Sequence, residues 1–445
     1  MKYRPLIKKT AKKVPVVRGI VSEREKLREL TKDQQKKINN ILKQKDELQR
    51  KLNKEINDRK NPKLTQNYKY STNELFQITK EDIIKSQAAT SGKMGKIITA
   101  NWFIPKFEHI SFGGLYTIFR FIEKLGKEGV TNRIIIYGDK EIDEKWLNSQ
   151  ITQNFPDLKN YKIISYHTQE NNPSQLPESD IAFCTLWDSA YIMLRFNKTK
   201  RKYYFIQDYE PLFFPAGPIS ALSESTYRFG FKGIINTRGL LEVIQSRHGM
   251  EAMSFTPGIN RNVYNPSSHE KKSSKTKIFF YGRPTKPRNA FDLGAETIKQ
   301  LLKKYGERIE VVIAGAEWDE SLYGLEEQIT NLGLIRTIEE VADLYRSCDI
   351  GFCFMLTRHP SYQPIEFMAS GVATVVNMNE SNLWLLKDGE NCLISEPSPK
   401  AMAATIGELV ENTNLTKKIV ENGYKTVDKL SWEGALDNIW NFIKN

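Results

Sequence analysis

The sequence predicts an α/β fold with two Rossmann-like lobes. From Lys96 onward, short apolar runs of strand length alternate with amphipathic stretches of helical spacing, and this pattern restarts after a polar break at His269–Lys275. Strands that alternate with helices indicate βαβ units, and therefore parallel sheets covered by helices on both faces. The length of 445 residues suits two or three domains of about 100–200 residues each.

We expect the first lobe to span residues 96–268. Its predicted strands are Ile97–Ala100, Arg133–Tyr137, Lys162–Ser165, Asp180–Thr185, Tyr203–Ile206 and Gly233–Asn236. Its predicted helices are Leu115–Gly126, Asp188–Phe196 and Arg238–His248.

The second lobe is expected at residues 269–430. Its predicted strands are Lys277–Tyr281, Glu310–Ala314, Asp349–Phe354, Ala373–Val376 and Asn391–Ile394. Its predicted helices are Ala290–Lys304, Ile338–Ser347, Ile365–Ser370 and Pro399–Glu411. Residues 431–445 follow as a final helix whose apolar side chains have helical spacing, and we expect it to pack back on the first lobe.

The positive charge of the chain is concentrated before the lobes. The net charge is +13, and residues 1–63 supply the whole surplus. This segment reads as a basic helical extension with a weak coiled-coil pattern, followed by a linker or cap at residues 64–95. This basic segment could bind an anionic membrane surface or associate with a second copy to form a homodimer, and a plain solvated helix is an equal alternative. Nucleic acid is not expected, because aromatic residues do not interleave with the basic ones.

The cysteines and the hydropathy of the sequence indicate the cellular compartment of the protein. None of the four cysteines forms a C-x-x-C pair, no Cys/His cluster has zinc-ligand spacing, and no run of 18 apolar residues occurs. The N-terminus also lacks the apolar core of a secretory signal. These features predict a cytoplasmic protein, with peripheral attachment to the inner face of the cell membrane as an option.

The clearest candidate site is a cationic loop after a predicted strand. Arg283, Lys286 and Arg288 follow directly on Phe280–Tyr281, in a loop stiffened by Pro284 and Pro287. Guanidinium groups match phosphate oxygens, and cations stabilise charge that develops on a leaving diphosphate. The alternative is a solvated basic turn, but a position at the carboxyl end of a strand favours a ligand site.

Two further loops have the pattern of an anion or sugar site. An irregular loop with His359, Ser361 and Tyr362 leads into a short helix that carries Glu366 in its first turn, where Glu366 could also merely complement the helix dipole. Gly113-Gly114 precedes the first helix of the first lobe. Two glycines allow close approach to a phosphate, although they more often form only a tight turn.

A carboxylate pair is the candidate for acceptor chemistry. Asp208 and Glu210 follow a predicted strand at positions i and i+2, and they could face the cleft and orient an acceptor hydroxyl. The alternative is that they cap the next helix or pair with Arg228.

From about Lys96 to the C-terminus, the chain resembles retaining glycosyltransferases of family 4, which have the GT-B fold. The likeness rests on the loop after Gly282-Arg283, the segment Leu332–Ile335, the helix and strand at Val341–Phe354, and Glu366–Gly371, which occur in the order of that family. Within the family it is most similar to bacterial rhamnosyltransferases that build surface-layer glycans. The runs Tyr204–Pro211 and His359–Tyr362 carry this closer likeness.

The resemblance implies a role for each candidate. Arg283 and Arg288 would bind the diphosphate together with Lys286, and Glu366 would bind the ribose. The loop amides near Ser361 and Tyr362, beside His359, would meet the distal phosphate. Backbone at Leu334 and Ile335 would meet the base, and Gly113-Gly114 matches the glycine loop of the first lobe. The family needs no dedicated base, because the leaving phosphate helps to deprotonate the acceptor.

One position departs from the pattern of the family. Arg358 stands eight residues before Glu366, where related enzymes hold a Glu against hydroxyls of the transferred sugar. We therefore expect a deoxyhexose donor, dTDP-L-rhamnose by resemblance, used without metal or any other cofactor. The acceptor would be a bacterial surface glycan, which could be lipid-linked, and the transfer would proceed with retention. The rivals are a sugar-nucleotide epimerase of the same fold and an inactive scaffold that binds a nucleotide sugar.

Overall fold

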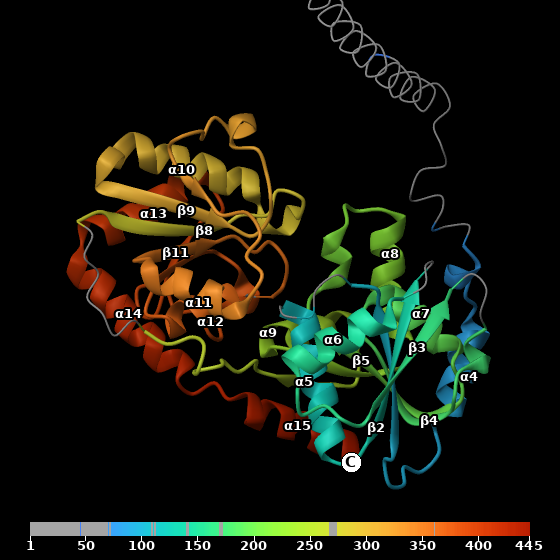
Figure 1. Ribbon diagram of the computed structural model, residues 1–445. Coiled ribbons are helices and arrows are strands. Elements are labelled where there is room, and N and C mark those ends of the chain that lie inside the picture. Colours follow the sequence, from blue (N-terminus) through green and yellow to red (C-terminus); the bar gives the residue numbers. More distant parts are fainter. Residues whose placement is uncertain are drawn as a thin grey trace, which may run out of the picture. The chain divides into compact units, whose positions relative to one another are not determined.

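The chain contains two parallel β-sheets, each covered by helices. The computed structural model describes Lys45, Tyr70 and residues 73–107, 110, 113–138, 142–168, 172–266, 274–359 and 361–445. The first sheet has seven strands in the order β3-β2-β1-β4-β5-β6-β7, and the second has six in the order β10-β9-β8-β11-β12-β13 (Figure 1). The predicted α/β class with two lobes is confirmed, whereas the basic extension predicted for residues 1–63 lies outside the described residues.

The first sheet and its helices follow one another as βαβ units. The strands are β1 (Thr99–Pro105), β2 (Thr131–Gly138), β3 (Tyr161–His167), β4 (Ser179–Cys184), β5 (Thr199–Ile206), β6 (Lys232–Asn236) and β7 (Ala252–Phe255). The helices are α4 (Lys80–Ala89), α5 (Gly113–Lys127), α6 (Glu144–Asn154), α7 (Trp187–Arg195), α8 (Pro218–Ser225) and α9 (Arg238–His248), with short 3-10 turns η1 (Glu74–Phe76), η2 (Pro173–Gln175), η3 (Glu210–Phe213) and η4 (Thr226–Arg228).

The second sheet repeats this organisation. Its strands are β8 (Thr276–Tyr281), β9 (Ile309–Ala314), β10 (Thr330–Asn331), β11 (Ile350–Cys353), β12 (Ala373–Asn377) and β13 (Leu393–Ser395). Its helices are α10 (Phe291–Tyr305), α11 (Ile338–Ser347), α12 (Gln363–Ala369), α13 (Pro399–Glu411) and α14 (Thr413–Val427), with 3-10 turns η5 (Pro287–Asn289), η6 (Gly306–Arg308), η7 (Glu320–Tyr323) and η8 (Glu380–Asn382). Helix α15 (Trp432–Lys444) follows at the end of the chain.

Several elements were not predicted, and their sequences show why. Helix α6 buries only Leu147 and Ile151, with Trp146 partly buried beside them, and its other residues are polar, so its apolar face is narrow. Strand β7 has only four residues at the edge of its sheet, with a single fully buried side chain, Phe255. Short edge elements with little buried apolar surface give a weak periodic signal.

Alternate residues of each central strand serve separate cores. In β8, Ile278 and Phe280 pack against α10 and α13, whereas Phe279 packs against α11 and α12. The first sheet does the same, with Trp102 of β1 in one core and Phe103 in the other. Side chains on a strand alternate between its two faces, and both faces of these sheets are covered by helices, so the strands read as continuous apolar runs.

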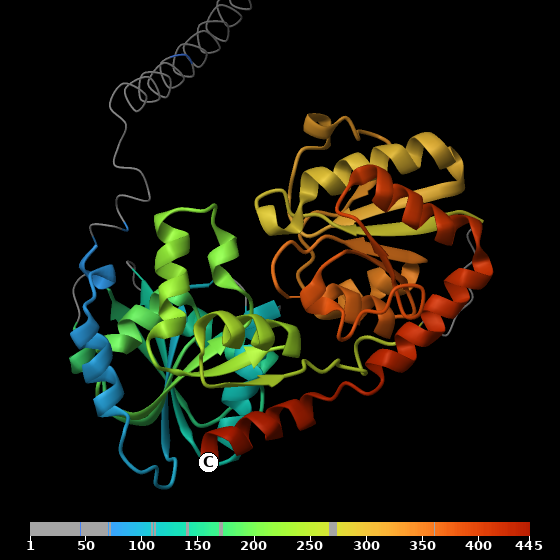
Figure 2. The same cartoon turned by 180° about the vertical axis from the view of Figure 1, so that it is seen from behind.

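The described residues before the first sheet pack against its helices. The Arg195 guanidinium at the end of α7 donates to the backbone carbonyls of Glu74 and Gln77, at 2.8 and 2.9 Å. Lys202 of β5 reaches α4, where its Nζ donates to Ser86 Oγ at 2.7 Å. Helix α4 therefore lies against the first lobe (Figure 2).

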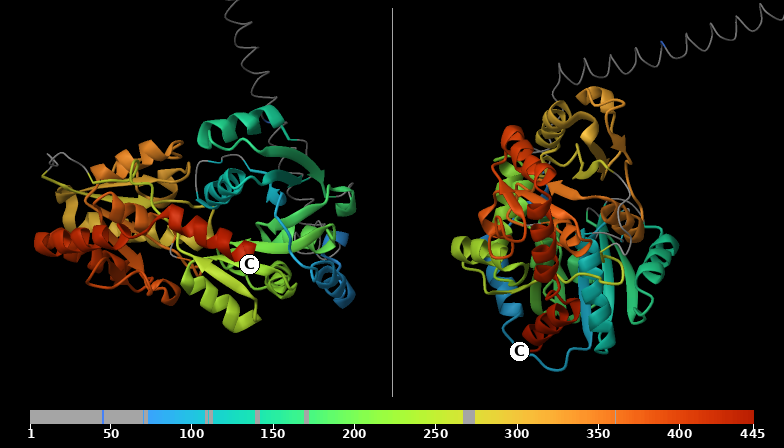
Figure 3. Two further views of the ribbon diagram at one scale, coloured as in Figure 1. Left: turned by 90° about the horizontal axis from the view of Figure 1, so that it is seen from below. Right: turned by 90° about the vertical axis from the view of Figure 1, so that its left-hand side faces the viewer.

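The final helix belongs to the core of the first lobe. Ala435, Ile439, Trp440 and Ile443 of α15 are buried in the core of the first lobe, where the helix contacts α5 and β7. Tyr203 of β5 donates to the carbonyl of Ile443 at 3.3 Å. Figure 3 shows this C-terminal helix, in red, against the first lobe. The chain thus leaves the first lobe after β7, forms the second lobe and returns. Among the described helices, none combines the length and apolar character needed to cross a membrane.

The outgoing and returning segments touch at Gly258. A Cβ atom at this position would collide with the backbone of Ser431 and Trp432. Because backbone atoms there cannot move aside as a flexible side chain would, glycine is required for the two segments to pass each other.

We predict that Gly258→Ala lowers the free energy of unfolding by about 1–3 kcal/mol, the range for overpacking a closely fitted site. Gly434→Ala is the matched control, because a Cβ atom there meets nothing within 4 Å. In helix α15 this control should keep or raise stability by up to about 1 kcal/mol. Urea unfolding of the two variants gives the comparison, and equal stabilities would contradict the crossing described here.

Candidate functional site

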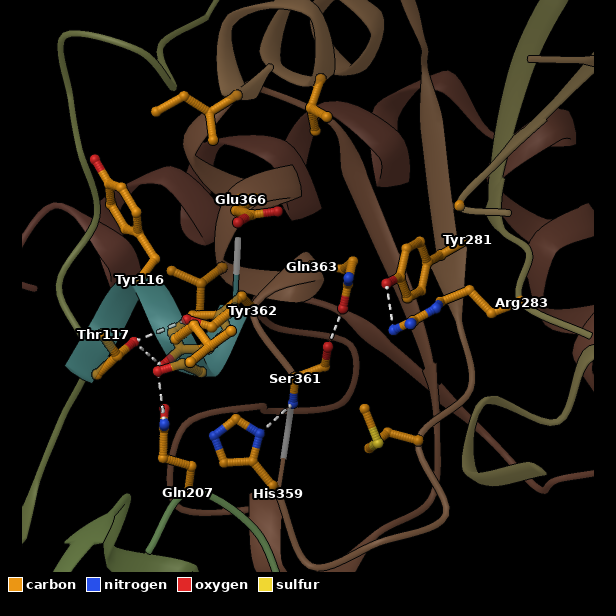
Figure 4. Close-up of a pocket in the computed structure, with 18 of the residues that line it drawn as sticks. Tyr116, Thr117, Gln207, Tyr281, Arg283, His359, Ser361, Tyr362, Gln363 and Glu366 are labelled. Atoms are coloured by element: carbon orange, nitrogen blue, oxygen red, sulfur yellow. Dashed lines mark hydrogen bonds between the residues drawn. The ribbon is translucent and has the colours of Figure 1, made fainter. Parts of the chain in front are cut away.

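A cavity of about 850 Å³ is lined by residues of both lobes. Ligands of open parallel sheets bind outside the carboxyl ends of the strands, and the lining comes largely from loops at those ends. Twelve residues that the sequence singled out line this cavity: Gly113, Gly114, Asp208, Arg283, Lys286, Arg288, Leu334, Ile335, His359, Ser361, Tyr362 and Glu366. Figure 4 labels Arg283, His359, Ser361, Tyr362 and Glu366 among them.

Three cations gather where β8 ends. Gly282 lets the chain pass close to β9 here, because a Cβ atom would lie 2.5 Å from the Ile313 side chain. The Arg283 guanidinium donates to Tyr281 Oη at 3.2 Å, and the Arg288 guanidinium lies 4.6 Å from the centre of the Phe213 ring. Among the described residues, none of these cations forms an ion pair within the cavity, so their charge is available to an anion.

The cations are held close together at an electrostatic cost. Burial lowers the pKa of Lys286, and the neighbouring Arg283 and Arg288 lower it further. Burial also lowers the pKa of Arg288, although the Asp208 carboxylate opposes that shift. Both shifts mean that the charged forms are less stable here than in water, and a bound anion would relieve this.

The loop between β11 and α12 is fixed by hydrogen bonds from several directions. Asn377 Oδ1 accepts from the Met355 amide at 2.7 Å, and His359 Nδ1 accepts from the Ser361 amide at 3.0 Å. Ser361 has a φ of 67°, a left-handed conformation that is uncommon for a residue with a side chain. Such strain persists where surrounding contacts determine the backbone, as they do in this loop.

Tyr362 joins this loop to the first lobe. Its hydroxyl lies 2.8 Å from Thr117 Oγ1 of α5 and accepts from Asn236 Nδ2, at the end of β6, at 3.0 Å. Burial raises the pKa of Tyr362 to about 12, so the hydroxyl stays protonated at neutral pH. This three-residue group fixes the start of α12 against the carboxyl edge of the first sheet.

Glu366 lies in the first turn of α12, next to an apolar wall. Its carboxylate accepts hydrogen bonds from Tyr264 and Tyr345, yet burial dominates and raises its pKa to about 7. The wall beside it consists of Leu334, Ile335, Ile338, Val341 and Leu344. An acceptor group in a cavity with an apolar lining suits a hydroxyl attached to an apolar ring system.

The two glycines at the start of α5 serve different purposes. Gly113 has a φ of 57°, which favours a residue without a side chain. At Gly114, a Cβ atom would lie 2.8 Å from Nε2 of Gln207, which donates to the Gly114 carbonyl at 2.7 Å. Gly114 therefore leaves room for Gln207, so that this side chain can reach the cavity.

Asp208 is the acidic group of the first lobe that faces the cavity. Its Oδ2 accepts from Thr357 Oγ1 of the second lobe at 2.9 Å. Burial raises the pKa of Asp208 to about 6, against the opposing effects of Thr357 and Arg288. A carboxyl group with a pKa near neutrality can exchange a proton with a bound hydroxyl.

The structure gives Glu210 a different position from the one that the sequence favoured. Its Oε2 accepts from the Trp187 amide at 2.6 Å and from the Tyr204 hydroxyl at 3.1 Å, inside the first lobe. It is 3% exposed and does not line the cavity. The i, i+2 spacing placed both carboxylates on one side, but η3 begins at Glu210 and turns its side chain inward.

Other residues of the cavity had no clear sequence signal. Thr117 lies one helical turn after Gly114. Gln207 directly follows the apolar strand β5, and Asn236 is the last residue of the apolar strand β6. Their polar character at those positions was the available clue. Arg358 does not line the cavity, and its neighbour His359 does.

Sequence comparison places both lobes in one family. The N-terminal domain of WsaF matches residues 100–238, and the C-terminal domain of WsaF matches residues 276–407. The O-antigen biosynthesis protein RfbC of Myxococcus xanthus is 39% identical over 375 residues, which cover 84% of this chain and 29% of that protein. The chain therefore spans less than a third of this curated relative.

Solved structures share the fold at low sequence identity. TarM of S. aureus superposes with a TM-score of 0.61 at 10% identity, covering 78% of this chain and 100% of that one. Anabaena HepE, in complex with UDP and glucose, gives 0.60 at 12% identity over 78% and 99% of the two chains. Sucrose-phosphate synthase of Thermosynechococcus elongatus gives 0.59 at 13% identity over 78% and 98%.

The two parallel sheets and the cavity at their carboxyl ends define a protein of the GT-B class. Both WsaF domains match in order and together cover more than half of the chain. The chain belongs to a glycosyltransferase family, and its two lobes correspond to the two WsaF domains.

We predict that Glu366→Gln weakens the pH dependence of stability between about pH 4 and pH 7. A Glu in an unfolded chain has a pKa of about 4.3, whereas folded Glu366 has a pKa of about 7. Between these values the folded protein keeps a proton that the unfolded chain has lost, so stability falls as pH rises, by up to about 1.4 kcal/mol per pH unit. Glu366→Gln should remove this contribution and leave those of Asp208, whose pKa burial raises to about 6, and of Asp188 and Glu210, whose pKa values burial also raises.

The measurement is the urea unfolding free energy as a function of pH. Glu421→Gln is the control, because Lys425 lowers the pKa of this carboxylate and its replacement acts only at lower pH. A Glu366→Gln profile parallel to that of the wild type would show that Glu366 is ionised in the folded state.

Proposed function

We propose that the protein transfers L-rhamnose from dTDP-L-rhamnose to a bacterial surface glycan, with retention and without a metal ion. The observation that carries the proposal is the cavity in which Arg283, Lys286 and Arg288 share one space with Glu366 and the apolar wall at Leu334–Ile335. A cationic cluster, a hydroxyl acceptor and an apolar surface are the features that a nucleoside diphosphate sugar requires.

The donor fits these features part by part. The diphosphate would contact Arg283, Lys286 and Arg288, whose burial makes an anion favourable there. The sugar of the nucleoside would donate to Glu366, and the base would pack against Leu334 and Ile335. The transferred sugar would then lie toward the first lobe, near the start of α5 and Asp208.

The same cations would stabilise the leaving group. Negative charge grows on the diphosphate as the glycosidic bond breaks, and preorganised donors aimed at that charge lower the barrier. This is the task that a metal ion performs in other transferases. The metal independence that the resemblance implies rests on this cluster.

The acceptor and the class of glycan are supported by sequence similarity. The name of the Myxococcus xanthus relative refers to O-antigen biosynthesis, and the runs Tyr204–Pro211 and His359–Tyr362 resemble rhamnosyltransferases of surface-layer glycans. Asp208, with a pKa of about 6, would orient the attacking hydroxyl. A lipid-linked acceptor would place the enzyme at the inner face of the cell membrane, with residues 1–63 as its contact or as a dimerisation segment.

We predict that Arg283→Ala and Arg288→Ala each slow transfer by roughly 10²–10³-fold, as the loss of one preorganised donor does elsewhere. Both variants should also weaken binding of the nucleoside diphosphate, measured by calorimetry. Arg308→Ala is the matched control, because this exposed arginine precedes β9 at the opposite end of the sheet. Near-normal transfer in both cavity variants would rule out this diphosphate site.

We predict that dTDP-L-rhamnose is turned over faster than UDP-glucose and GDP-mannose when the three compete at equal concentrations. Sites built to hydrogen-bond particular hydroxyls reject mismatched sugars strongly, because buried polar groups are left unpaired. An incubation without acceptor completes the assay, since an epimerase would form an isomer there and a transferase would not. Faster use of UDP-glucose or GDP-mannose would overturn the donor assignment and leave the diphosphate site standing.

A further inference from the structure

Three polar side chains of the cavity, Gln207, Asn236 and His359, each have one atom bound and one atom buried without a partner among the described residues. Asn236 belongs to the group that holds Tyr362, whereas Gln207 follows β5 in the first lobe and His359 lies in the loop before α12 of the second lobe (Figure 4). Among the described residues, Gln207 Oε1 and His359 Nε2 have no hydrogen-bond partner, although both atoms are buried. A buried polar atom left unpaired costs about 1–3 kcal/mol, so such atoms in a ligand cavity indicate groups that a ligand completes.

The free atom of Gln207 is an acceptor. Its Nε2 donates to the Gly114 carbonyl at 2.7 Å, and a carbonyl oxygen can only accept. This contact fixes the orientation of the amide and leaves Oε1 without a partner among the described residues. The absence of a side chain at Gly114 is what allows the approach.

The free atom of His359 is a donor. Its Nδ1 accepts from the Ser361 amide at 3.0 Å and therefore carries no hydrogen. Burial, assisted by the nearby charge of Arg288, lowers the pKa of His359 to about 3, so the ring is neutral. A neutral imidazole has one hydrogen, which must then be on Nε2.

A ligand that partners both atoms must offer a hydrogen-bond donor to Gln207 Oε1 and an acceptor to His359 Nε2. Phosphate oxygens only accept, and the base is accounted for by the apolar wall near Leu334. Hydroxyl groups both donate and accept, and a pyranose carries several of them. His359 lies near enough to Arg288 for that charge to affect its pKa, so the group it binds is next to the diphosphate, where the transferred sugar is attached.

We propose that Gln207 and His359 form a recognition pair for hydroxyl groups of the transferred sugar, with an acceptor from the first lobe and a donor from the second. This rests on the proposed function and adds the residues that select the sugar. A neutral, hydroxylated sugar satisfies the pair. A sugar with a carboxylate at the Gln207 contact does not, because it offers no hydrogen to Oε1.

Two substitutions of His359 separate recognition from loop support. In His359→Asn, Oδ1 replaces Nδ1 and keeps the bond to Ser361, but no donor reaches the position of Nε2. In His359→Gln, the amide nitrogen reaches the position of Nε2, while the bond to Ser361 is lost. Gln207→Met removes the acceptor at nearly constant volume.

The experiment measures dissociation constants by calorimetry for dTDP and for dTDP-L-rhamnose, with UDP/UDP-glucose and GDP/GDP-mannose as further pairs. The quantity of interest is the ratio of the two constants within a pair, for the pair that the wild type binds most tightly. We expect His359→Asn and Gln207→Met to raise the dissociation constant of the nucleotide sugar by about tenfold and that of the free diphosphate by less than about twofold. His359→Gln should keep a ratio within about threefold of the wild type.

The opposite order overturns the proposal. If His359→Gln loses binding of both ligands and His359→Asn behaves as the wild type, then His359 only supports the loop through Ser361. Equal ratios in all variants would likewise refute recognition by this pair, while the diphosphate site would stand. If the wild type binds none of the nucleotides, the proposed function fails, and this inference fails with it.

Discussion

The hydroxyl of Tyr362 is the contact on which the geometry of the cavity depends. It is shared by Thr117 of α5 and Asn236 of β6, so one atom of the second lobe is held by two elements of the first. Each of those elements is anchored in the core of its own sheet, and the hydroxyl is buried among polar partners, where a lost hydrogen bond leaves unpaired groups. The position of Tyr362 then determines where α12 begins, and with it the position of Glu366.

The loop before Tyr362 transmits this constraint to the rest of the site. Asn377 and Asn379 bind its backbone at Met355, while Thr357 binds Asp208 across the cavity. With both ends fixed in this way, Ser361 is held at a positive φ, and His359 lines the cavity with its Nε2 buried and unpartnered among the described residues. The strain at Ser361 is therefore a consequence of satisfying the polar groups on either side of it.

The sequence predicts the parts of this site that depend on local order, and not those that depend on tertiary contacts. Arg283 and Arg288 stand out because a strand must end before them, and Glu366 because a helix must begin beside it. Thr117 and Tyr362 are 245 positions apart, and no spacing rule relates them. Glu210 shows the same limit in reverse, because its i, i+2 relation to Asp208 suggested a shared face that the turn η3 does not provide.

The cations of the cavity are better suited to bind an anionic ligand than to form ion pairs with the carboxyl groups of the cavity. Burial lowers the pKa of Lys286 and Arg288 and raises the pKa of Asp208 and Glu366, so every one of these groups is less favourably charged than in water. Direct pairing would relieve this, but Asp208 is bound by Thr357 and Glu366 by two tyrosines. A diphosphate at the cations would relieve Lys286 and Arg288 and, by its own negative charge, raise the pKa of Asp208 further. In the proposed reaction, donor binding would then favour a protonated Asp208, so that deprotonation of the acceptor would fall to the departing phosphate and Asp208 would position the hydroxyl.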